Sequence, residues 1–134
     1  MSKLNVPVEE FTTPDPKTAD ENMLIDDVRQ MMDEMGIRHL PITRGDTVVG
    51  VISDRDVRVL SGLSAEQRAL VRAGDIMAAD LVTVTVSMPL DRVAYIMSDK
   101  KVGSVIVMGD DDKFFGIFTV TDALNALIEI VRGD

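Results

Sequence analysis

The chain contains two copies of one short motif. Residues 50–56 read Gly-Val-Ile-Ser-Asp-Arg-Asp, and residues 116–122 read Gly-Ile-Phe-Thr-Val-Thr-Asp, 66 positions later. The apolar pair in each copy is typical of the end of a buried strand. The hydroxyl residue that follows is a favoured N-cap for a helix. Each copy therefore predicts a strand-to-helix corner with a hydroxyl and a carboxylate one turn apart, a pair that can bind a sugar and its phosphate.

The repeat extends well beyond this motif. Residues Phe11-Thr12-Thr13 are matched to Val82-Thr83-Val84, which leaves about six extra residues before the first helix. A period near 65 that occurs twice predicts two similar subdomains packed together, whereas periods of 20–50 residues indicate open arrays. A shift of 65 positions also superimposes five apolar pairs, namely Ile25 on Leu90, Val28 on Val93, Met32 on Met97, Ile37 on Val102, and Leu40 on Val105.

Composition excludes several classes of function. The net charge of −9 over 134 residues argues against nucleic-acid binding, which depends on Lys and Arg. No apolar run approaches the length that spans a bilayer, and no signal-peptide pattern opens the chain, so no membrane association is expected. The absence of Cys excludes disulfides and thiol chemistry and fits a reducing compartment, so we expect a cytoplasmic protein.

The same order of elements is predicted twice. Hydrophobic periodicity and turn residues predict an α/β (α+β) fold in which each half is β-α-β-β-α. We expect a first repeat over 1–62, a linker helix over 63–74 that opens with a capping box at Ser64, and a second repeat over 75–134. The expected elements are strand 11–13, helix 22–35 ended by Gly36, strands 37–43 and 48–53, helix 54–60, strand 82–86, a helix from Pro89, strands 102–108 and 114–119, and helix 120–131.

This arrangement resembles the tandem cystathionine-β-synthase (CBS) domain pair, or Bateman module. The two motifs carry the resemblance, together with Ile76-Met77 and the segments 37–42 and 102–107. Residues 50–56 are also similar to the regulatory domain of IMP dehydrogenases. The resemblance covers residues 6–131 and implies a stand-alone module whose halves are related by a pseudo-twofold axis.

The resemblance also implies ligands and residue roles. Family members bind adenosine-containing ligands such as AMP, ADP, ATP or S-adenosylmethionine in clefts between the two repeats. Asp56 and Asp122 would accept charge-assisted hydrogen bonds from ribose hydroxyls, and Ser53 and Thr119 would contact phosphate or ribose oxygens. The remaining implied residues are Arg38 and His39 for phosphate, Thr121, Thr83 and Arg55 as further ligand contacts, and Thr12, Thr13, Val84, Ile37 and Val102 for the adenine slots.

Two departures from the family pattern bear on ligand binding. The second copy has Gly103-Ser104 where the first has Arg38-His39, so it lacks the basic pair. Asp54 places a second carboxylate beside the first motif, which repels phosphate unless Arg55 or Arg58 compensates. We therefore expect only one of the two clefts to bind a nucleotide well.

Each candidate residue also has a structural interpretation. Ser53 and Thr119 can act as helix caps alone, and Asp56 and Asp122 can act by complementing the helix dipole. The lone histidine, His39, can be a half-buried structural residue, and Arg38 can be simply solvated. The run of Asp residues over 110–112 lacks the ligand spacing of a calcium loop and is interpreted as a hairpin tip, so no metal site is expected.

Three functions stay open on the sequence alone. The first is a regulatory module that senses an adenine nucleotide, needs no other cofactor, forms a homodimer and acts on a partner protein. The second is a ligand-free scaffold that dimerises through its helices. The third is a metal-assisted phosphohydrolase using Asp54, Asp56 and Asp122, although the chain offers no P-loop and no second histidine. We expect no catalytic residues and no enzyme activity.

Overall fold

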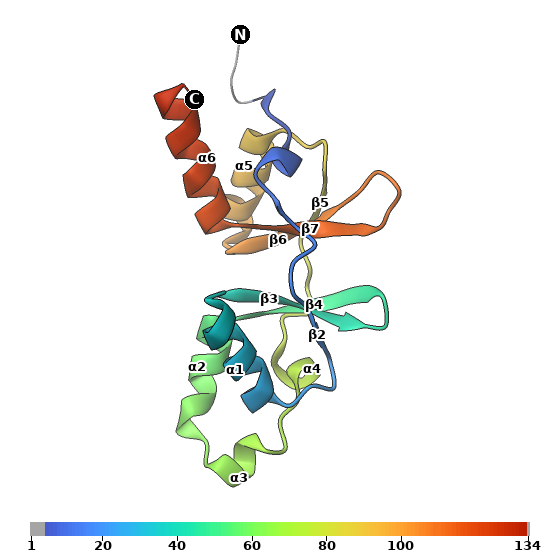
Figure 1. The fold of residues 1–134 in the computed structure, drawn as a ribbon, viewed down its shortest axis with the longest axis vertical. Helices are drawn as coiled ribbons and strands as arrows, with labels where there is room; N and C mark the ends of the chain where they lie inside the picture. The colour runs from blue at the N-terminus through green and yellow to red at the C-terminus, as the bar shows by residue number, and fades with distance from the viewer. Residues whose placement is uncertain (1–4, 134) are drawn as a thin grey trace. The chain divides into compact units, whose positions relative to one another are not determined.

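The chain folds into two compact units, each of which mixes helices with one small sheet. The computed structural model describes residues 5–133. Unit 1 consists of residues up to Pro16 together with those from Val82 onward, and unit 2 consists of Lys17–Leu81 (Figure 1). The predicted mixed fold with two repeated subdomains is confirmed.

Unit 1 is a four-stranded sheet with two long helices. The strands lie in the order β1-β7-β6-β5, where β5 is parallel to β6 and the other neighbours are antiparallel. Its elements are the 3-10 helix η2 (Val8–Glu10), β1 (Thr13–Pro14), β5 (Thr83–Thr85), α5 (Leu90–Lys100), β6 (Ser104–Met108), β7 (Phe114–Thr119) and α6 (Val120–Arg132).

Unit 2 is a three-stranded sheet in the order β2-β3-β4, with β2 parallel and β4 antiparallel to β3. The left-handed backbone of Gly36 ends its first helix as predicted. Its elements are β2 (Ala19–Asp20), α1 (Ile25–Met35), β3 (His39–Arg44), β4 (Thr47–Ser53), α2 (Asp54–Val59), η3 (Leu60–Gly62), α3 (Ala65–Arg68) and α4 (Ala73–Ile76).

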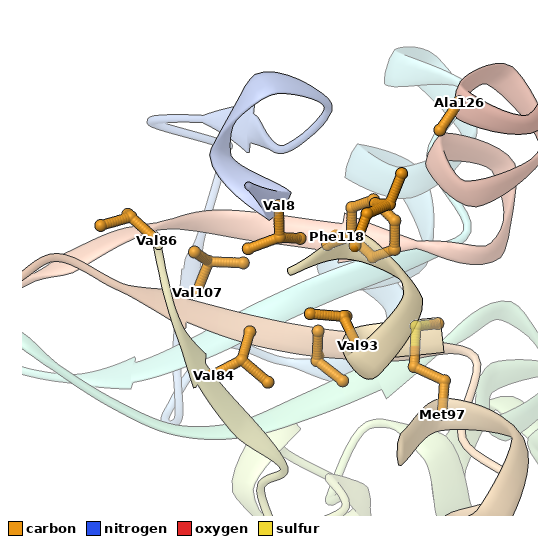
Figure 2. Close-up of a cluster of buried hydrophobic side chains, with 10 residues drawn as sticks. Val8, Val84, Val86, Val93, Met97, Val107, Phe118 and Ala126 are labelled. Carbon is orange, nitrogen blue, oxygen red and sulfur yellow. The ribbon is translucent and has the colours of Figure 1, made fainter. Parts of the chain in front are cut away.

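Each unit buries its own apolar core between helices and sheet. In unit 1, Phe118 is fully buried and packs among valines from η2, β5, α5 and β6 (Figure 2). In unit 2, Ile52 occupies the position 66 residues before Phe118 and is likewise buried. The apolar repeat positions matched in the sequence, such as Val28 and Val93, lie in these two cores. The repeat is therefore a repeat of core positions.

The predicted first strand, 11–13, is assigned to the wrong sheet. Thr13 begins β1, which pairs antiparallel with β7 in unit 1. The true counterpart of β5 is β2, because Ala19 pairs with Ile42 just as Val84 pairs with Val107, 65 positions later. No extra residues separate the first strand from its helix. The sequence does not predict β2, because a strand of two residues that contains an Asp shows no period-2 pattern.

The initial segments of the two repeats occupy equivalent positions in opposite units. Thr13 pairs with Ile117 in unit 1, and Ala78 forms the matching bridge to Val51 in unit 2. Residues 8–14 thus complete the unit whose other strands come from the second repeat, and residues 73–79 complete the unit of the first. The compact units therefore divide the chain differently from the repeat boundaries 1–62 and 75–134.

The predicted linker helix over 63–74 is interrupted: α3 covers only Ala65–Arg68, and α4 begins at Ala73. The capping box at Ser64 is confirmed, since its hydroxyl accepts a hydrogen bond from the Gln67 amide at 3.1 Å. The helix ends at Arg68, because the following segment binds the start of α1: the Ile25 amide donates to the Val71 carbonyl at 2.9 Å. Tertiary hydrogen bonding thus replaces further helical turns.

A substitution at Gly116 tests the packing of β1 on β7. A Cβ atom there would overlap the Thr13 carbonyl oxygen, a backbone atom, whereas a Cβ at the equivalent Gly50 would mainly meet the flexible Met77 side chain. We expect Gly116→Ala to cost about 1–3 kcal/mol of unfolding free energy. Gly50→Ala should cost less, because a methionine side chain adapts. Denaturant midpoints measure both, and equal losses would contradict this account of β1.

Candidate functional site

The second motif forms a strand-to-helix corner in unit 1. Strand β7 ends at Thr119, and α6 begins at the next residue. The Thr119 hydroxyl accepts a hydrogen bond from the Asp122 amide at 3.4 Å, and Oδ2 of Asp122 accepts one from the Thr119 amide at 2.9 Å. The two side chains therefore form a reciprocal capping box, which confirms their structural role.

The first motif forms the same corner in unit 2. The Ser53 hydroxyl accepts from the Asp56 amide at 3.3 Å, and Oδ2 of Asp56 accepts from the Ser53 amide at 2.9 Å. The capping residues Ser53, Asp56, Thr119 and Asp122 are half-buried, so both corners are partly exposed to solvent. A carboxylate has about four acceptor positions, so capping leaves each Asp capacity for a ligand.

Strand β1 brings a third side chain to the corner of unit 1. The Thr13 hydroxyl donates to Oδ1 of Asp122 at 3.5 Å, across 109 residues of sequence. The equivalent residue at the corner of unit 2 is Ala78, which has no hydroxyl. The two corners thus share their capping boxes but differ in polarity, and the corner of unit 1 combines two hydroxyls with one carboxylate.

A polar hollow of about 480 Å³ adjoins this corner in unit 1. Two of its lining residues, Thr12 and Asp122, were site candidates from the sequence. The others were missed, although positions 122, 125, 129 and 132 recur on one face of a helix, a spacing that the sequence displays. The lining consists of Glu10, Phe11, Thr12, Asp122, Asn125, Ile128, Glu129 and Arg132.

Unit 2 has a hollow of about 380 Å³ beside helices α1 and α2. Of the sequence candidates, Ile37 and Asp54 line it, while Ser53 and Asp56 do not. The charges of its two basic and two acidic residues cancel, and Nη2 of Arg58 lies 3.9 Å from Oδ2 of Asp54. The lining consists of Arg29, Met32, Asp33, Ile37, Asp54, Val57, Arg58 and Ser61.

The corner of unit 2 is accompanied by basic residues. The Arg38 carbonyl accepts a hydrogen bond from the Asp54 amide at 2.8 Å, and His39 pairs with Ser53 across strands β3 and β4. Burial lowers the pKa of His39, and the nearby carboxylates of Asp54 and Asp56 only partly oppose this effect. His39 is therefore neutral at pH 7. Of this basic pair, only the exposed Arg38 offers a positive charge to a phosphate.

The remaining candidates lie in varied surroundings. The Thr12 side chain is buried, and its hydroxyl donates to the Val8 carbonyl at 2.8 Å. Val84 is packed in the core of unit 1 (Figure 2), so its side chain does not form a ligand surface there.

Thr83 is exposed on β5, and Val102 is half-buried after α5. The last two candidates, Arg55 and Thr121, are exposed at equivalent positions on α2 and α6.

Residues 5–133 offer neither a metal-binding cluster nor a membrane-spanning helix. The described residues contain no group of three or more His, Asp or Glu side chains placed to hold a metal ion. None of their helices has the length and hydrophobicity needed to cross a membrane.

Comparison with known proteins identifies relatives over nearly the whole chain. The sequence description of the CBS domain matches residues 8–61 and 73–129. The structure is similar to that of CBSX2 from Arabidopsis thaliana, solved in complex with AMP, with 27% identity, 94% coverage of this chain, 98% of the other, and a TM-score of 0.79. It is also similar to the CBS domain pair of protein MJ0100 in complex with 5′-methylthioadenosine and S-adenosyl-L-methionine, with 25% identity, coverage of 93% and 98%, and a TM-score of 0.80.

Curated relatives are longer proteins. An inosine-5′-monophosphate dehydrogenase of Korarchaeum cryptofilum is 29% identical over 122 residues, which cover 91% of this chain and 24% of that protein. A homoserine O-acetyltransferase of Methanohalobium evestigatum is 27% identical, also over 24% of its length. The chain thus spans about a quarter of the curated relatives it matches first.

Proposed function

This chain belongs to the CBS-domain family, with two copies of the domain, and on that basis we propose that it is a regulatory module that binds adenosine-containing ligands. The observation that carries the proposal is the grouping of Thr13, Thr119 and Asp122 beside a hollow in unit 1. The role that we propose for this pair of CBS domains is regulatory.

The geometry of this corner suits a ribose. Vicinal hydroxyls can both donate to one carboxylate, and hydrogen bonds to a charged acceptor are about twice as strong as neutral ones. Asp122 presents this carboxylate from a rigid helix start, held by its own capping bonds. The neighbouring hollow of about 480 Å³ falls within the range of small-molecule sites. The relatives that bind AMP, 5′-methylthioadenosine and S-adenosylmethionine support the same ligand class.

Ligand binding at this corner can alter the connection between the two units. Thr13 lies in β1, and the chain passes from β1 into unit 2 after Pro16. A ligand that contacts both Thr13 and Asp122 would hold β1 against β7 and restrict that connecting segment. Regulation requires that the ligand bind one conformation more tightly than the other. We propose that this differential affinity shifts the chain toward one conformation and that a partner protein detects this shift.

One exposed surface favours a homodimer as the assembled form. Helix α6 presents Val120, Leu124, Leu127, Ile128 and Val131, which are 48–76% exposed. The spacing of these residues places them on one side of the helix. A ligand-free scaffold that dimerises through this surface is the second candidate function, and α6 is the observation that favours it.

Calorimetric titration tests the leading proposal. We expect saturable heat with at least one of adenosine, AMP, ADP, ATP and S-adenosylmethionine. We also expect a higher melting temperature, since ligand at about 100 times its Kd stabilises a protein by about 2.7 kcal/mol. ATP should be recovered intact after incubation. An absence of heat with all five compounds and an unchanged melting temperature would reject the proposal, and a stable dimer in light scattering would then favour the scaffold.

A further inference from the structure

The hollow of unit 1 is negatively charged. Its lining contains the carboxylates of Glu10, Asp122 and Glu129 and a single cation, Arg132. Within residues 5–133, Glu10, Glu129 and Arg132 take part in none of the three ion pairs found. Three negative charges therefore face one positive charge, and no salt bridge within the described part of the chain neutralises them.

The basic residues that accompany the corner of unit 2 have no counterparts in unit 1. Arg38 and His39 correspond to Gly103 and Ser104, 65 positions later. Arg55 and Arg58 correspond to Thr121 and Leu124, 66 positions later. Each basic position beside the first motif is thus neutral beside the second, although the backbone corner is the same.

The start of α6 does not compensate for this loss of cations. The amides of a helix N-terminus can bind an anion when they are unpaired. Here the Thr119 amide donates to Asp122, the Val120 amide to the Gly103 carbonyl at 3.1 Å, and the Asp122 amide to the Thr119 hydroxyl. The Asp122 carboxylate also offsets the positive end of the helix dipole. At the start of α6 a phosphate would therefore meet negative charge and few available amide donors.

We propose that the site of unit 1 selects adenosine derivatives that carry no phosphate and discriminates against AMP, ADP and ATP. This inference rests on the proposed adenosine-binding function. Asp122 accepts the ribose hydroxyls of either class of ligand, but a phosphate adds up to two negative charges beside Glu10 and Glu129. A ligand that is neutral or cationic at its 5′ substituent avoids this repulsion, and a cationic one is attracted.

NMR titration of the unsubstituted chain tests the inference, because amide shifts report each unit separately. Shifts over residues 119–125 follow unit 1, and shifts over 53–59 follow unit 2. We expect adenosine to bind unit 1 about tenfold or more tightly than AMP at low ionic strength. That ratio should fall as salt exceeds about 0.1 M, where the Debye length is about 10 Å.

Variants locate the cause of the discrimination. Glu10→Gln combined with Glu129→Gln should reduce the ratio of AMP to adenosine dissociation constants toward one. Asp110→Asn combined with Asp111→Asn removes the same charge from the hairpin tip, outside the hollow, and should leave the ratio unchanged. Equal effects of the two pairs would mean that the net charge of the chain causes the discrimination, and would contradict the role of Glu10 and Glu129 in the hollow.

Two further outcomes separate this inference from the function on which it rests. If AMP binds unit 1 as tightly as adenosine, and Arg132→Gln weakens AMP alone, the inference is wrong and the adenosine site stands with Arg132 as its phosphate contact. If neither compound, nor S-adenosylmethionine, shifts residues 119–125, unit 1 has no adenosine site and the proposed function fails there. If adenosine binds more tightly than AMP but the ratio of their dissociation constants does not change with salt, the discrimination is not electrostatic and the inference is wrong.

Discussion

Replacing Asp122 with Asn is expected to weaken adenosine binding at unit 1 by about 10- to 100-fold. A hydrogen bond to a charged group contributes about 1.5–3 kcal/mol, and each 1.4 kcal/mol is a factor of about ten in affinity. The carboxamide keeps the size of the side chain but accepts at one atom only and loses the charge. The Thr13 hydroxyl, now 3.5 Å from Oδ1, would also lose its charged partner. Calorimetry or NMR titration with adenosine measures the change.

The controls for Asp122→Asn separate binding from folding. The Asn side chain can still accept a hydrogen bond from the Thr119 amide, so the cap should lose less than about 1 kcal/mol and the melting temperature should change little. Asp110→Asn makes the same charge change at an exposed hairpin position and should leave adenosine binding intact. Unchanged affinity in Asp122→Asn would mean that its carboxylate only caps α6.

Truncating Phe118 to Ala is expected to cause the largest loss of stability, about 3–5 kcal/mol. Phe118 is fully buried in the core of unit 1, where Val8 from η2 and Ala126 from α6 also pack (Figure 2). Removing the ring leaves a cavity among residues from both ends of the chain. Because the total free energy of unfolding of natural domains is about 5–15 kcal/mol, this loss is a large fraction of the stability.

The loss in Phe118→Ala should be confined to unit 1. The two units have separate cores, so we expect unit 1 to open before unit 2. Hydrogen exchange should accelerate at Val105 and Val107 and change less at Leu40 and Ile42. Phe115→Ala, the same change at a half-buried position of β7, should cost less. A single uniform acceleration over both units would show that they unfold as one body.

The repeat and its chemistry could be read from the sequence. The matched apolar positions and the turn residues predicted helices α1 and α5 and the hairpins β3–β4 and β6–β7. Burial of one face of an element imposes a hydrophobic period that the sequence displays. The hydroxyl residues at the two corners predicted N-caps, which the structure confirms at Ser53 and at Thr119 and completes to capping boxes with Asp56 and Asp122. Local patterns were sufficient here, since each of these features involves residues no more than a few positions apart.

Other features could not be read in this way, because they depend on contacts between distant residues. The two-residue strands β1 and β2 are too short to show a period, and their partners alone define them. The linker helix was predicted too long because the Val71 carbonyl binds the start of α1 instead of continuing a helix. Burial also decided that Val84 belongs to the core and that His39 is neutral.

By itself, the sequence determined that the fold is built twice, where each core lies and which corner residues cap the helices, because these properties follow from local periodicity and side-chain chemistry. Only the tertiary structure decided that the initial segment of each repeat completes the unit of the other. It also decided that Thr13 meets Asp122 beside an acidic hollow. The physical reason is that the pairing of Thr13 with Ile117, far apart in the sequence, is selected by the packing of the whole unit, and no local pattern encodes the partner.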